Sequence, residues 1–164
     1  MDFEIFANPV FELRVIIDVV IASLLTGLVG LEREVSGKPA GFRTQMIIGG
    51  AAALLISTAR ILIRDFASES DLAAVMQADP VRVIEAVIVG ISFIGAGTIL
   101  KMREQRKVQY LTTAASILFS AGIGMSVALH HYIIAVGVTL FILFINVVAN
   151  IIDRYIQKRK RQRD

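Results

Sequence analysis

The sequence contains no cysteine and no tryptophan, and charged residues make up only 19% of its 164 residues. The absence of cysteine excludes disulfide bonds and metal sites built from thiolates. Without tryptophan, any aromatic residues at a membrane boundary must be phenylalanine or tyrosine. So few charged residues could not cover the surface of a soluble domain, which indicates a membrane protein.

The sequence also lacks the short motifs of common enzyme and nucleotide sites. It has no HExxH pattern, no P-loop, no GxGxxG turn and no recognisable Ser/His/Asp set. Each of these motifs places particular side chains or glycines where a reaction or a phosphate requires them. We therefore expect neither an enzyme nor a bound cofactor.

Long apolar runs are what the sequence does contain, with 55% hydrophobic residues and a mean hydropathy of +0.70. A bilayer core about 30 Å thick requires about 20 helical residues. The runs are continuous rather than alternating, which favours helices over barrel strands. We predict an all-α membrane protein, a single-domain bundle of five transmembrane helices at about 13–31, 46–63, 83–100, 111–129 and 132–153.

The basic residues are distributed unevenly between the two sides of such a bundle. If the N-terminus lies outside, the inner regions contain Arg33, Lys38, Arg43, Lys101, Arg103, Arg106, Lys107, Arg154, Lys158, Arg159, Lys160, Arg161 and Arg163. The outer regions contain only Arg14, Arg60, Arg64 and Arg82. The positive-inside rule therefore predicts an N-out, C-in orientation. The basic tail at 154–164 is then a topology anchor for anionic lipid rather than a nucleic-acid patch.

A connector rich in charge, glycine and proline, residues 32–44 with the sequence EREVSGKPAGFRT, lies between the first two apolar runs. Glu32 and Glu34 are acids at the C-terminal end of a helix, where the dipole disfavours them. Pairing with Lys38 and Arg43 across the turn, binding of a divalent cation by carboxylate oxygens, and contact with a partner protein are three explanations. Thr44 and Thr113 stand at the starts of the second and fourth helices and are candidate N-caps. The N-termini of these two helices lie beside basic side chains, so they favour binding of an anion, or of a carboxylate of the chain that folds back onto them.

Two carboxylates, Asp18 and Glu85, lie inside the first and third predicted helices. An ionised carboxylate is costly there unless it has a partner or water. The two acids could share one charge in a cation or proton site, or each could pair with a nearby arginine, Arg14 or Arg82. Gly95-Ala96-Gly97 in the same third helix could break the helix and expose carbonyl groups to an ion, or admit a crossing helix.

Small residues recur every fourth position in the first and fourth helices, at Ala22, Thr26 and Gly30 and at Ser116, Ser120 and Gly124. This spacing lets helices approach closely in lipid, within one chain or in a homo-oligomer, which we expect here. Asn146 and Asn150 form a polar stripe with Asp153 on the last helix, and such a stripe commonly bonds to another helix. His130 and His131, between the last two helices, titrate in a range that would suit pH sensing.

Three ordered stretches resemble the signature of the MgtC/SapB family of bacterial inner-membrane proteins: "GLVGLEREVSGKPAGFRT", "DPVRVIEAVIVGISFIGAGTIL" and "LTTAAS". The resemblance implies a five-helix protein that regulates ion and energy homeostasis under magnesium limitation or acid stress, in some members by restraining the F-type ATP synthase. The alternative is a small Mg²⁺ or H⁺ transporter that uses Asp18, Glu85, Gly95 and Gly97. For the regulator, the residues expected to contact a membrane-protein partner are Glu32, Arg33, Glu34, Lys38, Gly41, Arg43, Thr44, Thr112 and Thr113.

Overall fold

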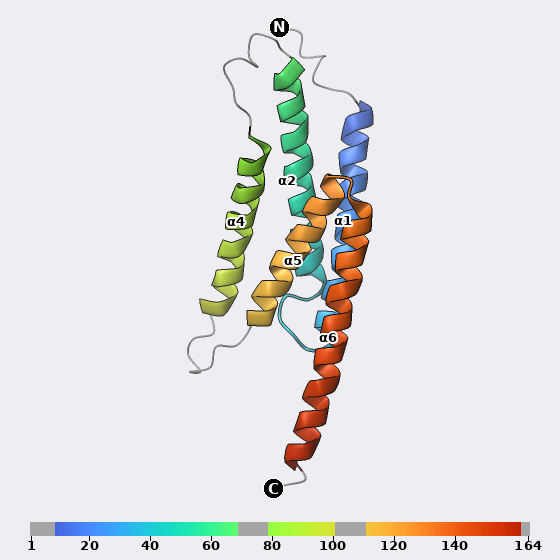
Figure 1. Cartoon of the computed structure of the whole chain (residues 1–164), viewed down its shortest axis with the longest axis vertical. Coiled ribbons are helices and arrows are strands. Elements are labelled where there is room, and N and C mark those ends of the chain that lie inside the picture. Colours follow the sequence, from blue (N-terminus) through green and yellow to red (C-terminus); the bar gives the residue numbers. More distant parts are fainter. Residues whose placement is uncertain (1–8, 69–78, 101–110, 162–164) are drawn as a thin grey trace.

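The computed structural model describes residues 9–68, 79–100 and 111–161, and these form five helices (Figure 1). They are α1 (Pro9–Val35), α2 (Phe42–Ser68), α4 (Pro80–Leu100), α5 (Leu111–Ala128) and α6 (Tyr132–Arg161). All five are long and apolar enough to cross a bilayer, which confirms the predicted fold class. The helices start at or before the residues that the sequence predicted, and α6 continues through most of the basic tail.

Two sequence expectations concern residues outside the described part of the chain. The basic residues at 101–107, which the predicted orientation uses, lie there. The side chains of the basic tail are also outside it, although the backbone of α6 is helical to Arg161.

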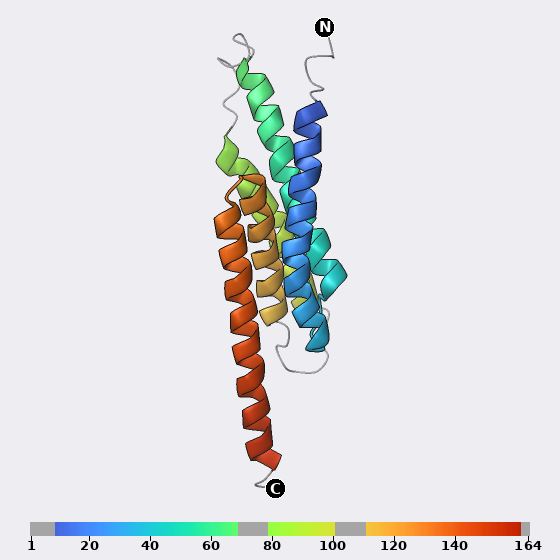
Figure 2. The same cartoon turned by 90° about the vertical axis from the view of Figure 1, so that its right-hand side faces the viewer.

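The central helix of the bundle is α5, which packs against all four of the others. The helices α1 and α2 lie antiparallel along each other and share the most extensive contact. In Figure 1 α4 lies at one edge of the bundle, and in both views the last turns of α6 run past the ends of the other helices (Figures 1 and 2).

Small residues make the close approach of α1, α2 and α5 possible. A Cβ atom added to Gly124 of α5 would lie 2.1 Å from the carbonyl oxygen of Gly49 in α2. A Cβ added to Gly49 would lie 2.4 Å from the side chain of Thr26 in α1, and one added to Gly30 would lie 2.7 Å from the Cα of Phe42. The small residues that the sequence analysis noted in α1 and α5 therefore serve packing within the chain.

The two ends of the bundle differ in chemistry. At one end, which we call the charged end, α1 finishes, residues 36–41 form a link, and α2 and α5 begin. At the other, the hairpin end, α5 turns into α6 through His130 and His131. There the amide of His131 donates to the carbonyl of Ser126 and that of His130 to Val127, both at 2.8 Å. This pattern is a Schellman motif, with His130 at φ +61°, the left-handed position that glycine usually fills.

Candidate functional site

The charged end is held together by Glu34 and by a tight link. Gly37 and Ala40 have φ values of +65° and +55°, so the chain reverses within six residues. The carboxylate of Glu34 accepts the backbone N–H of Phe42 at 2.9 Å and lies against Gly41, where a side chain would clash at 2.8 Å. Glu34 thus satisfies the first N–H group of α2 and opposes the positive end of its dipole.

Thr44 and Thr113 are not the caps that the sequence predicted. Each is the third residue of its helix, because α2 begins at Phe42 and α5 at Leu111. Thr44 is exposed, and so is Thr112, whereas Thr113 is fully buried and receives a hydrogen bond from Arg33. A carboxylate folded back onto a helix N-terminus, which the sequence analysis also considered, is present at α2.

Arg33 is the most deeply buried charge at this end, with 3% of the residue exposed. Its Nη2 donates to the Thr113 hydroxyl at 2.5 Å and to the carbonyl of Pro39 at 3.3 Å. Nearby, Gln45 is also buried and donates to Ser116 at 3.0 Å and to the carbonyl of Ala40 at 3.2 Å. These side chains join the end of α1 and the starts of α2 and α5 into one polar layer.

Glu32 points away from this layer, toward α6. Its two carboxylate oxygens accept hydrogen bonds from Asn146 at 2.7 Å and from Asn150 at 2.8 Å, and the Ser36 hydroxyl donates to it at 2.9 Å. The expected bond from the asparagine stripe to another helix is therefore confirmed, with a carboxylate as its partner. Three neutral donors therefore stabilise the charge of Glu32 by hydrogen bonds.

Pairing of the connector's acids with Lys38 and Arg43, one of the three explanations considered, is not found in the described residues. In the part of the chain that the structure describes, neither basic residue forms an ion pair, and both are exposed. Glu32 and Glu34 take different partners on different helices, so they do not converge as metal ligands. Among the described residues no group of three or more His, Cys, Asp or Glu side chains could hold a metal ion.

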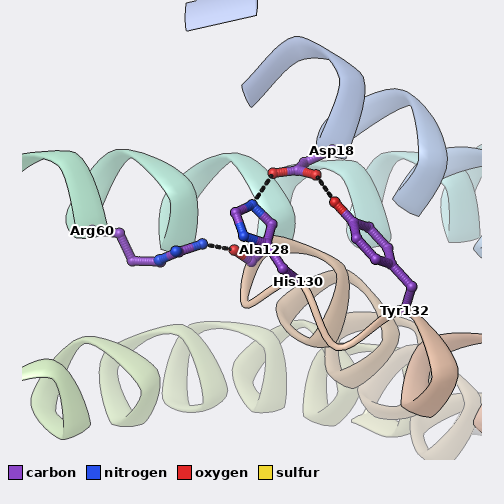
Figure 3. Close-up of polar contacts among 5 residues, drawn as sticks. All are labelled: Asp18, Arg60, Ala128, His130 and Tyr132. Carbon is purple, nitrogen blue, oxygen red and sulfur yellow. Dashed lines mark hydrogen bonds and ion pairs between the residues drawn. The ribbon is translucent and has the colours of Figure 1, made fainter. Parts of the chain in front are cut away.

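At the hairpin end, Asp18 is 2% exposed and has two partners from the α5–α6 turn (Figure 3). The Tyr132 hydroxyl donates to one carboxylate oxygen at 3.0 Å, and Nε2 of His130 lies 3.3 Å from the other. Arg60 of α2 donates to the carbonyl of Ala128, at the C-terminal end of α5, where a cation suits the helix dipole. Asp18 therefore anchors the α5–α6 hairpin to α1, and the arginine pairing considered for it is replaced by these contacts.

The structure does not bring Glu85 to Asp18. Glu85 is exposed on α4 and forms no hydrogen bond or ion pair with other described residues, while Arg82 pairs at 3.8 Å with Asp79. Helix α4 also continues unbroken through Gly95 and Gly97. Gly95 packs 3.5 Å from the Ala114 side chain of α5, and Gly97 faces open space. The predicted two-carboxylate site and the helix break are therefore both absent from the described residues.

Sequence reasoning missed the partners that matter most. Tyr132 and His130 lie more than a hundred residues from Asp18, and no spacing rule connects them. Gln45 follows directly after the Arg43-Thr44 pair of the connector and was overlooked because a single glutamine in an apolar helix has no motif. One available signal was its polarity inside a membrane span, which by itself requires a buried partner.

The five spans define a polytopic α-helical membrane protein. A family model described as the MgtC family matches residues 19–155, which is most of the chain. The chain therefore belongs to the MgtC family. It is similar to "Putative magnesium transporter YhiD" of Escherichia coli strain K12, 38% identical over 71% of this chain and 52% of that protein.

Other relatives give a similar picture. "Protein MgtC" of Salmonella typhimurium strain LT2 is 33% identical over 80% of this chain and 51% of its own length. An uncharacterized protein of Haemophilus influenzae is 33% identical over 87% of this chain and 58% of its own. The chain thus spans about half the length of the relatives it matches. No solved structure matches it.

Proposed function

We propose that the protein is a membrane regulator of ion and energy homeostasis, active under magnesium limitation or acid stress, rather than a conduit for cations. It would lie in the bacterial inner membrane with its N-terminus outside and its C-terminus inside. It would act by binding another membrane complex, such as the F-type ATP synthase. Membership of the MgtC family and the name of the YhiD relative support a connection with magnesium.

The buried guanidinium of Arg33 is the observation that carries this proposal. It lies where α1, α2 and α5 meet at the charged end and contacts Thr113 and Pro39. A fixed positive charge in a protein interior repels cations, and pores use such charges to exclude them. A Mg²⁺ ion would carry two charges past this point, which makes a cation path through the centre of the bundle unfavourable.

The exposed basic residues of the connector supply a surface for a partner. Lys38 and Arg43 flank the link and have no ion pair within the described residues. They are free to meet an acidic surface, and Glu34, Gly41 and the link fix their positions. Changing both residues to glutamate should abolish binding to the purified ATP synthase membrane sector, while Arg82→Glu, the same charge reversal at an exposed arginine of α4, should bind normally.

Ion flux in proteoliposomes tests the choice between regulator and transporter. Vesicles would contain Mg²⁺- and H⁺-sensitive dyes and either the native chain, Asp18→Asn or Arg33→Gln. We expect no flux from the native chain or from Asp18→Asn. Native flux that Asp18→Asn removes would refute the proposal and favour a transporter. Flux that appears only in Arg33→Gln would support the barrier role of the guanidinium.

A small Mg²⁺ or H⁺ transporter remains the second candidate, because polar side chains line the interior of the bundle. Ser57 and Ser120 are buried, and their hydroxyl groups have no partner among the described residues. The carbonyl oxygen of the Gln45 side chain is also unpaired. These oxygens could pass a proton, a smaller cargo than a hydrated metal ion, and the H⁺-sensitive dye would detect it.

Orientation can be measured independently, since the native chain has no cysteine to react. Single cysteines in place of Lys38 and His131 mark the two exposed ends of the bundle. In intact cells a membrane-impermeant maleimide should label the variant at position 131 and spare the variant at 38. We further expect a homo-oligomer in the lipid bilayer, with no nucleic-acid binding, no cofactor and no enzymatic role.

A further inference from the structure

The imidazole of His130 touches a buried carboxylate and solvent at the same time. Its Nε2 lies 3.3 Å from one oxygen of Asp18, whose side chain is 2% exposed, whereas 32% of the histidine side chain is exposed (Figure 3). The other oxygen of Asp18 accepts a hydrogen bond from Tyr132. The ring can therefore exchange a proton with water, while the carboxylate that it faces is shielded from water.

Protonation of His130 changes the nature of this contact. A neutral imidazole donates from one nitrogen only, whereas an imidazolium donates from both and carries a positive charge. A hydrogen bond between two charged groups is about twice as strong as one between neutral groups. Within the described residues Asp18 has no ion pair other than the one with His130. A proton on the ring thus supplies the positive charge that a buried carboxylate requires.

The backbone around His130 favours the same protonated form. The residue follows the last turn of α5, where its amide donates to the carbonyl of Val127 at 2.8 Å. The C-terminal end of a helix carries partial negative charge and stabilises a cation, including a protonated histidine. The ring also stacks on Tyr132, with centroids 6.0 Å apart and an interplanar angle of 23°, which keeps it beside the carboxylate.

Other charges around the ring act in the opposite direction but more weakly. Arg14 of α1 and Arg60 of α2 lie close enough to Tyr132 to act on it electrostatically, and both would repel a positive ring. Both are exposed, so water and salt screen them. Helix α5 has no ionisable side chain. The ionisable residues of the described part of α4 form no ion pair with His130, and they are Arg82 and Glu85.

We propose that His130 and Asp18 form a pH-sensitive latch that holds the α5–α6 hairpin on α1. Helix α6 depends on such contacts because only 17% of its membrane span is buried, against 50% for α5. Its other polar bonds to α1 are at Glu32. The latch tightens as the pH falls through the range near 6.5 in which histidine takes up a proton, and the charge pair is lost as the pH rises above that range.

The ring can be titrated directly, because the chain contains only two histidines. Nuclear magnetic resonance spectra of the purified full chain with isotope-labelled histidine would be recorded in micelles across the titration range, with His131→Asn assigning the two signals. The midpoint of His130 should lie about one pH unit higher in the native chain than in Asp18→Asn, because that variant removes the opposite charge. The midpoint of the exposed His131 should be the same in both.

Thermal unfolding provides a second measurement, which does not require Asp18→Asn to fold. His130→Asn removes the titrating group and suits the left-handed backbone position, which asparagine adopts more readily than most residues. Between about pH 8 and pH 6, the melting temperature of the native chain should rise relative to that of His130→Asn by about 3 °C. The matched control His131→Asn should follow the native chain.

Two results would overturn the inference. In the first, Asp18→Asn leaves the midpoint of His130 where it is in the native chain. In the second, the melting temperatures of the native chain and of His130→Asn depend on pH in the same way, or His131→Asn alone loses the dependence. Both measurements use the chain without a partner, so the latch is tested separately from the proposed regulatory role.

Discussion

Replacing Gly124 by alanine should destabilise the protein more than other glycine-to-alanine changes in the same helix. The new Cβ would lie 2.1 Å from the carbonyl oxygen of Gly49 and 3.0 Å from its carbonyl carbon. A tolerable contact between carbon and a carbonyl oxygen is about 3.3 Å, so α2 and α5 would have to separate by about 1 Å at this point. Both clashing atoms belong to the backbone, so no side-chain rotation relieves the contact.

The expected magnitude follows from two opposing effects. Overpacking a well-packed interior costs about 1–3 kcal/mol, and the shift here involves the central helix of the bundle. Alanine favours a helix over glycine by about 1 kcal/mol, which offsets part of that cost. Since a rigid backbone contact lies at the upper end of the overpacking range, we expect a net loss of about 2 kcal/mol in the free energy of unfolding.

The matched control is Gly122→Ala, two residues earlier in α5, where nothing lies within 4 Å of the added Cβ. Only the helix preference acts there, so this variant should be neutral or more stable by up to about 1 kcal/mol. Equilibrium unfolding of the purified protein in mixed micelles measures both. If the two variants have equal stability within about 0.5 kcal/mol, the close contact of α2 and α5 is wrong.

Three further predictions concern the polar contacts. In a double-mutant cycle, Asp18→Asn and Tyr132→Phe should show a coupling free energy of about 1 kcal/mol, measured by equilibrium unfolding, and independent effects would contradict their hydrogen bond. At the left-handed turn position, His130→Gly should be more stable than His130→Ala by about 1 kcal/mol, and a reversed order would exclude the observed backbone conformation. Asn150→Leu should lower the free energy of unfolding by about 1–3 kcal/mol because Glu32 loses a donor, and Glu32→Gln in that background should cost less than in the native chain.

Much of the fold could be predicted, because each helix is specified by residues adjacent in sequence. Continuous apolar runs require helices in lipid, where the backbone must satisfy its own hydrogen bonds. The small residues around Gly30 and Gly124 also indicated close helix packing. Helix ends were less accurate: α2 begins at Phe42 because Glu34 caps it from the preceding helix, and that contact depends on the geometry of the link.

The candidate sites could be predicted only in part. Asp18 and the asparagine stripe were recognised as polar groups that need partners, but the partners were not. Glu85 was joined to Asp18 because both are acids near one predicted membrane face, whereas α4 lies at the edge of the bundle with Glu85 exposed. Depth along a helix can be read from sequence, but the direction in which a side chain faces depends on neighbouring helices.

The sequence by itself determined that this chain is a five-helix membrane protein with a charged connector after the first helix. It did so because hydrophobicity, helix length and turn residues act locally. Only the tertiary structure decided that Arg33 reaches the first turn of α5, that Glu32 binds two asparagines of α6 and that Asp18 holds the α5–α6 hairpin. Those contacts join residues far apart in sequence, and the close packing of small residues at the helix crossings fixes which side chains meet.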